Sequence, residues 1–117
     1  MTAYAIAHLR PAPELHAEVL DYMERIQSTL DPFEGRFLIH GAPRTEVLEG
    51  DFDRAVVMIG FPSYDQAHAW YHSAAYQELL PRRTAHMDGD ALLIDGVPPG
   101  YEAAATAAAL RAARTAA

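Results

Sequence analysis

The chain has 117 residues, half of them hydrophobic, and a formal net charge of −7. This length suits a single domain, and the hydrophobic fraction excludes a disordered chain. The negative charge argues against nucleic acid as a partner, and the lack of cysteine excludes disulfides and thiolate chemistry. No apolar run is long enough to span a membrane, and the first residues do not resemble a signal peptide, so we expect a cytoplasmic protein.

The first expected strand, residues 4–9, separates small side chains from large ones. Because side chains alternate along a strand, its alanines share one face and its larger residues share the other. We expect helices to cover the alanine face and to approach it closely. The two sets are Ala3, Ala5 and Ala7 on one side and Tyr4, Ile6 and His8 on the other.

An amphipathic helix follows a proline-containing break at residues 10–14. Apolar residues recur at steps of three and four from Leu15 to Leu30, which predicts a helix over that range. Asp31-Pro32 ends it, because the residue before a proline avoids the helical region.

Two strands come next. The first spans Phe33 to Gly41 and is centred on residues 36–40, and residues 45–50 either continue it or form a short edge piece. The second, residues 54–61, is apolar almost throughout, so we expect it to be central and covered on both faces.

The second half of the chain repeats the helix–strand pattern. Ser63 and Gln66 have the spacing of a capping box at a helix start, and Ser73 re-caps a segment that is broken at Pro81. Residues 91–95 form the last strand. Residues 102–117 are mostly alanine and therefore favour a helix, which predicts a domain over residues 1–97 and a helical tail over residues 98–117.

This order, β-α-β-β-α-β, is that of a ferredoxin-like α+β fold, with helices on one face of an antiparallel sheet. The other face would carry large apolar side chains, including Tyr4, Ile6 and either Val57 or Met58. Monomers avoid exposing such patches, so we expect a homodimer paired through its sheet faces.

One pattern is specific enough to indicate a family. Phe61-Pro62-Ser63 is followed by Trp70-Tyr71-x-Ser73-x-x-Tyr76, and Arg83 and Asp95-Gly96 come later. Over about residues 3–97 the chain resembles domain-of-unknown-function family 1330 and, through it, the dimeric α+β barrel superfamily, which includes small monooxygenases, cyclases and isomerases. The resemblance implies the fold and dimerisation more than any activity.

Two positions depart from the family pattern. Where typical members carry Arg-Gly-Gly, this chain has His40-Gly41-Ala42, and where they carry a Glu before Phe-Pro-Ser, it has Gly60. If that Arg and Glu belong to a polar site, the departures imply a lost ion pair or a changed ligand.

Four residues are candidates for catalysis. His40 is either a general acid or base or a solvated strand-end histidine. Arg83 either binds a carboxylate or enolate through its guanidinium or pairs with an acidic residue. Tyr71 and Tyr76 either position a polar ligand or belong to the core with their hydroxyls satisfied at its rim.

Four further residues are candidates for ligand binding. Trp70 completes the aromatic cluster, although packing is its simplest role, and His8 is a possible neighbour of His40. Tyr4 shares the face of His8, and Arg54 either binds an anion or pairs with a nearby aspartate. We expect neither a metal nor an organic cofactor, since His68 and His72 share a helix face but lack an evident third ligand.

The sequence leaves three functions open. The first is a cofactor-independent enzyme of the cyclase, isomerase or monooxygenase type, acting on a small aromatic or enolisable compound. The second is a non-catalytic ligand-binding or accessory protein with the same fold. The third is a structural partner whose alanine-rich tail docks on another chain.

Overall fold

The computed structural model describes residues 2–10 and 12–116, and a four-stranded sheet organises it. The strand order is β2-β3-β1-β4, and every neighbouring pair is antiparallel. This topology confirms the ferredoxin-like α+β fold and the central position of the most apolar strand. The strands are β1 (Ala3–Leu9), β2 (Arg36–His40), β3 (Ala55–Phe61) and β4 (Gly89–Asp95).

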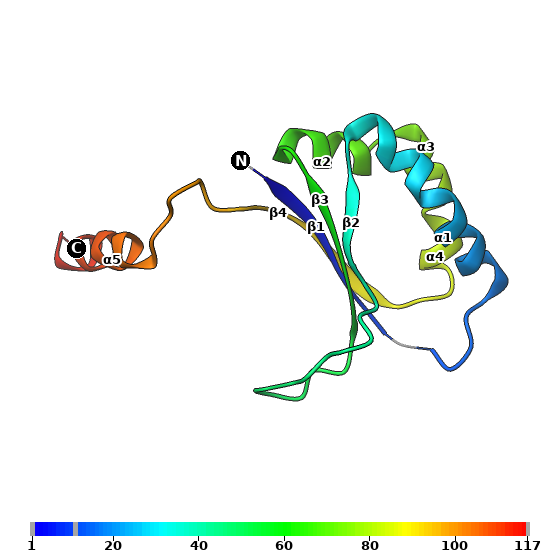
Figure 1. Ribbon diagram of the computed structural model, residues 1–117, viewed down its shortest axis with the longest axis horizontal. Helices are drawn as coiled ribbons and strands as arrows, with labels where there is room; N and C mark the ends of the chain where they lie inside the picture. The colour runs from blue at the N-terminus through cyan, green and yellow to red at the C-terminus, as the bar shows by residue number, and fades with distance from the viewer. Residues whose placement is uncertain (1, 11, 117) are drawn as a thin grey trace.

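Four helices lie on one side of this sheet, as Figure 1 shows. They are α1 (Ala17–Leu30), α2 (Tyr64–Tyr71), α3 (Ala74–Leu79) and α4 (Pro81–Thr84). The buried core forms where α1, α2 and α3 meet the sheet, and Phe61 and Leu30 are its largest fully buried side chains.

The start of α1 differs from the prediction by two residues. The helix begins at Ala17, and Leu15 lies outside it. The reason is an N-cap: His16 has extended backbone angles, and its Nδ1 accepts a hydrogen bond from the Glu18 amide at 3.0 Å. A histidine is an uncommon cap, so the sequence pattern of proline and acid placed the start too early.

The second strand is shorter than predicted. Asp31–Phe33 form a 3-10 turn, η1, and β2 starts only at Arg36. Gly35 lies between them because a Cβ there would come within 2.6 Å of the Phe61 ring and 2.7 Å of Leu30. Residues 45–50 form neither a continuation of β2 nor an edge strand.

Both predicted serine caps are present. The Ser63 hydroxyl accepts from the Gln66 amide, and that of Ser73 accepts from the Tyr76 amide. Pro81 ends α3, as expected, but it also starts the extra turn α4, a position that proline favours because it has no amide hydrogen to satisfy.

The sheet face under the helices does not hold them as closely as predicted. Ala3 is fully buried, but Ala5 and Ala7 are only half-buried and line a cavity. The alanines of β1 do face the helices, yet in the middle of the strand they leave space rather than close it.

Among the described residues, no helix lies against the opposite face of the sheet (Figure 1). The expectation that β3 is covered on both faces is therefore not met within one chain. Alternation and register place Ile6 beside Met58 and Leu92 on this face, and Leu38, Leu92 and Ile94 are each nearly half exposed.

The alanine-rich tail forms the predicted helix, α5 (Ala103–Ala116). All its residues are exposed, and Figure 1 shows it projecting away from the sheet and the other helices. Among the described helices, none combines the length and hydropathy that crossing a bilayer requires.

Candidate functional site

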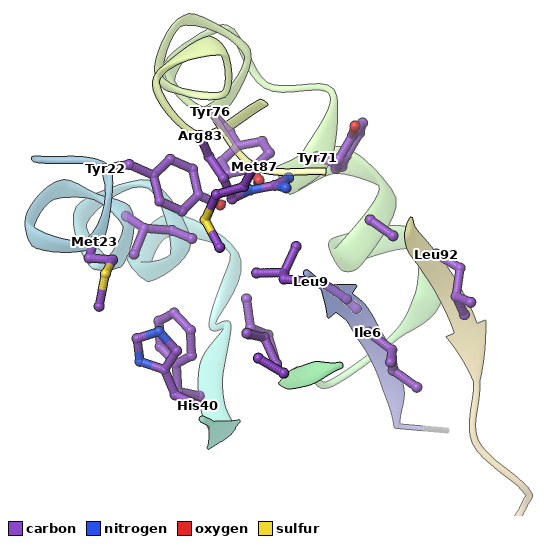
Figure 2. A pocket seen from close by; sticks show the side chains of 18 of the residues that line it. Ile6, Leu9, Tyr22, Met23, His40, Tyr71, Tyr76, Arg83, Met87 and Leu92 are labelled. Atoms are coloured by element: carbon purple, nitrogen blue, oxygen red, sulfur yellow. Dashed lines mark hydrogen bonds between the residues drawn. The ribbon is translucent and has the colours of Figure 1, made fainter. Parts of the chain in front are cut away.

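A cavity of about 720 Å³ lies mainly between the helices and the alanine-bearing face of the sheet, and Ile6 and Leu92 of the opposite face also belong to its lining. This is within the range of small-molecule sites. Its floor comes from β1 and β3, and α1 and α3–α4 form the opposite wall (Figure 2). Aliphatic and aromatic side chains dominate the lining, and no described Asp or Glu lines it. Its polar members include Tyr22, His40, Tyr71, Tyr76 and Arg83.

Arg83 is the one arginine that lines this cavity among the described residues. It extends from α4, half-buried, with its Cζ 5.5 Å from the centre of the Tyr22 ring. Within residues 2–10 and 12–116, no carboxylate lies within ion-pair distance of its guanidinium. The structure therefore gives no support, among the described residues, to the alternative role of Arg83 in an ion pair with an acidic residue.

Two phenols lie beside this guanidinium. Tyr22 on α1 and Tyr76 on α3 place their hydroxyl oxygens 2.7 Å apart, so one donates a hydrogen bond to the other. Burial raises the pKa of Tyr76 well above its ordinary value, and the adjacent Tyr22 raises it further. Tyr76 therefore stays protonated and acts as a hydrogen-bonding group, not as a base.

The charge of Arg83 is maintained despite its partial burial. Burial alone would lower the pKa of Arg83, but the neighbouring oxygens of Tyr22 and Tyr76 outweigh it and raise the pKa. A permanent cation and two hydroxyls thus meet in the wall of an apolar cavity. Such a group of donors suits the oxygen of a carboxylate or an enolate.

The remaining predicted aromatic residues lie beside this group. Trp70 is almost fully buried, its ring centre lies 4.1 Å from that of Tyr76, and its Nε1 donates to Thr29 at 3.0 Å. Its polar atom is thus already satisfied. Tyr71 is half-buried at the cavity edge, with its hydroxyl directed away from Arg83 (Figure 2).

His40 lies at the end of β2, on the side of the cavity away from Arg83 (Figure 2). It is exposed, and its ring centre lies 5.0 Å from that of Phe37. The other family departure, Gly60, concerns the opposite sheet face: it pairs with Tyr4, and a Cβ there would contact Leu38. Of the two departures from the family pattern, only His40 belongs to the cavity lining, so only this one changes the cavity.

Three predicted ligand-binding residues lie outside the cavity lining. Tyr4 and His8 are on the outer face of β1, where the His8 ring contacts Phe52 edge-on at 5.1 Å. Arg54 approaches Asp53 at 3.6 Å, which is the ion pair considered as its alternative role. The strand alternation already separated Tyr4 and His8 from the helix-covered face.

Tyr22 is the residue of this site that the sequence did not indicate. It occupies an apolar position of α1, next to Met23, so its spacing is that of a core residue. Its hydroxyl becomes significant only because α3 brings Tyr76, 54 positions later, within hydrogen-bond distance. A polar tip on an otherwise apolar helix face is the one signal that could have identified it.

Residues 2–97 match the family described as a domain of unknown function, DUF1330. The chain belongs to the DUF1330 family. Among curated protein sequences, none matches it.

Solved structures share the DUF1330 fold at low sequence identity. A protein of unknown function from Rhodopseudomonas palustris has a TM-score of 0.61 and 17% identity, with 84% of each chain covered. A variant of SnoaB, a cofactor-independent oxygenase from Streptomyces nogalater, has a TM-score of 0.56 and 13% identity, covering 86% of this chain and 98% of that one. An antibiotic biosynthesis monooxygenase has a TM-score of 0.52 and 21% identity, covering 82% of this chain and 99% of that one. The likeness to these structures agrees with the ferredoxin-like α+β fold of this DUF1330 chain.

The buried phenol predicts how stability depends on alkaline pH. Because folding raises the pKa of Tyr76, its contribution to stability is complete below about pH 10, the value of a free tyrosine, and is lost as pH rises above it. The free energy of unfolding should therefore fall between about pH 10 and 12, and it should fall less in Tyr76→Phe. Urea unfolding at several pH values measures this. If the free energy of unfolding falls equally steeply with pH in the wild type and in Tyr76→Phe, the raised pKa does not belong to Tyr76.

Proposed function

We propose that this protein is a cofactor-independent enzyme that binds a small aromatic anion and enolises it. The observation that carries the proposal is the guanidinium of Arg83, free of any described carboxylate, beside the hydroxyls of Tyr22 and Tyr76 in the wall of an apolar cavity. The apolar lining fits an aromatic ring, and the absence of acidic residues from the described lining fits a negative charge.

The chemical step assigns proton transfer to His40 and binding of the negative oxygens to the tyrosine–arginine group. An imidazole nitrogen of His40 takes a proton from the carbon next to a carbonyl, and the electrons of that C–H bond move onto the carbonyl oxygen as an enolate. Arg83 and the phenols stabilise the negative oxygens. Return of the proton to oxygen gives the enol, so this tautomerisation needs no other reactant.

The similarity to a cofactor-independent oxygenase supports the same first step. An oxygenase that lacks a cofactor must use an electron-rich substrate, and an enolate is one. Monooxygenation would then require molecular oxygen as a second substrate. Tyr71 and Trp70 would contribute ring surface against the ligand.

One observation favours the second function, ligand binding without turnover. His40 is exposed, and within the described chain no side chain hydrogen-bonds to it. A general base usually has a group that orients it. A binding protein needs only the cavity and Arg83.

Phenylpyruvate is the probe that separates these functions, because it is aromatic, anionic and enolisable. We expect the protein to accelerate its keto–enol tautomerisation, followed by the ultraviolet absorbance of the enol. His40→Ala should lower kcat by about 100-fold or more, as expected for loss of an acid–base group. Arg83→Met should weaken binding, measured by quenching of Trp70 fluorescence.

His8→Ala is the matched control, since it removes a histidine from the outer sheet face and should change neither quantity. Binding that depends on Arg83 without any turnover would establish the ligand-binding function. Turnover that survives His40→Ala would remove the role given to that residue. Absence of both binding and turnover would contradict the proposal as a whole.

We also propose that the protein is a homodimer paired through the outer sheet faces. The face that no helix covers is apolar at its centre, with Ile6, Met58 and Leu92 side by side. Its pairing would bury side chains that are nearly half exposed in one chain.

The test replaces one residue at the centre of that face. In light scattering coupled to gel filtration, we expect the wild type at twice its chain mass of 12.8 kDa and Met58→Glu near one chain mass. A carboxylate buried between two apolar faces would lack a partner. Leu20→Glu, at an exposed position of α1, should remain dimeric. A Met58→Glu protein that stays dimeric would place the interface elsewhere.

A further inference from the structure

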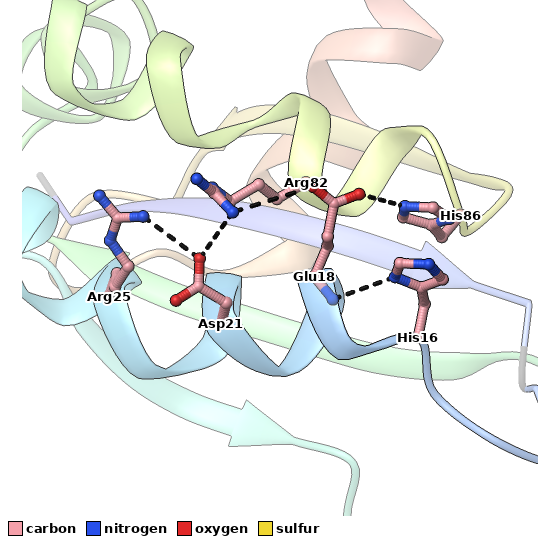
Figure 3. Close-up of polar contacts among 6 residues, drawn as sticks. All are labelled: His16, Glu18, Asp21, Arg25, Arg82 and His86. Carbon is pink, nitrogen blue, oxygen red and sulfur yellow. Dashed lines mark hydrogen bonds and ion pairs between the residues drawn. The ribbon is translucent and has the colours of Figure 1, made fainter.

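A second cluster of polar side chains lies outside the cavity, where the start of α1 meets the end of α4 (Figure 3). Nitrogen atoms of His16 and His86 and a carboxylate oxygen of Glu18 all lie within 4.8 Å of one another. His86 Nε2 is 2.7 Å from Glu18 Oε1. The three residues come from segments about 70 positions apart, so the fold brings them together and local sequence does not.

The two imidazole rings are arranged face to face. The ring centres of His16 and His86 are 3.5 Å apart, with 8° between the ring planes. Because the in-plane lone pairs of stacked rings run parallel, one ring must rotate about its side-chain bonds for both nitrogens to bind the same ion. A neutral imidazole is the form that binds a metal ion.

The Glu18 carboxylate lies between a histidine and an arginine. Its Oε1 contacts His86, while Oε2 faces Arg82 at 3.9 Å. Arg82 makes its closer contact with Asp21, at 2.9 Å, which offsets the repulsion that a bound cation would feel.

We propose that His16, Glu18 and His86 form a binding site for a zinc ion that joins α1 to the end of α4. Two imidazoles and one carboxylate are a ligand set that suits Zn²⁺, with water in the fourth position. The ion would replace the proton in the contact between His86 and Glu18. Binding through His16 Nδ1 would also compete with the capping bond from the Glu18 amide.

The position of the site gives it a structural role. His86 follows Arg83 by one helical turn, and the amides of His86 and Met87 both donate to the Arg83 carbonyl. Met87 and Arg83 line the cavity. A metal bound by His86 would therefore fix the turn that carries Arg83 against α1 and stabilise the fold.

The test uses the full chain without an affinity tag, treated with chelator and titrated with zinc chloride at pH 7.5. Calorimetry should give one zinc ion per chain. Because only the folded chain holds the three ligands together, Tm should rise by about 5 °C for each tenfold increase in zinc above the Kd. His86→Ala should weaken binding by more than about tenfold, since even outer-shell partners of a metal contribute that much.

Two variants separate binding at this cluster from binding by surface histidines elsewhere on the chain. His16→Asn retains an N-cap acceptor while removing the imidazole, so it should fold and still bind zinc less tightly. The double variant His68→Ala/His72→Ala removes a histidine pair at the C-terminal end of α2, whose ring centres are 4.4 Å apart, and should leave zinc binding unchanged. Three results would overturn the proposal: a loss of zinc affinity in the His68→Ala/His72→Ala variant, an unchanged zinc affinity in His86→Ala, or a Kd for zinc weaker than about 100 μM in the wild type.

Discussion

The structure depends on the small side chains of β1. A central strand that presents Ala5 and Ala7 toward the helices cannot fill the space beneath them, so the layer between helix and sheet stays partly empty. At Ala3 the same pattern produces close packing, because α2 covers that end of the strand. The alternation of small and large residues along β1 therefore determines both the cavity under the helices and the apolar outer face of the sheet.

The helices supply the chemistry of this cavity and the sheet supplies most of its apolar surface. Tyr22, Tyr76 and Arg83 come from three different helices, and they meet because α3 and α4 pack along α1. Only His40 enters from the sheet, at the end of a strand. A ligand that contacts both His40 and Arg83 must therefore span the cavity.

The sequence predicted the fold well because the relevant signals are local. The apolar run of β3 and the serines at positions 63 and 73 each specify their own element, and the structure contains all of them. The site was less predictable, since it depends on distances between helices. Tyr22 looked like a core residue, and the cluster of His16 and His86 joins positions that no local pattern connects. Conversely, Tyr4 and His8 were candidates by residue type although their strand face pointed them away from the helices.

The most direct test of this account is the effect of enlarging two alanines of the same strand on the free energy of unfolding. At equal protein concentration, Ala7→Leu should fold with unchanged or greater stability, because the added carbons enter existing space. Ala3→Leu should lose about 1–3 kcal/mol, because that site is already filled. If both variants lose stability equally, the space above Ala7 is closed in solution, and the cavity on which the proposed function rests does not exist.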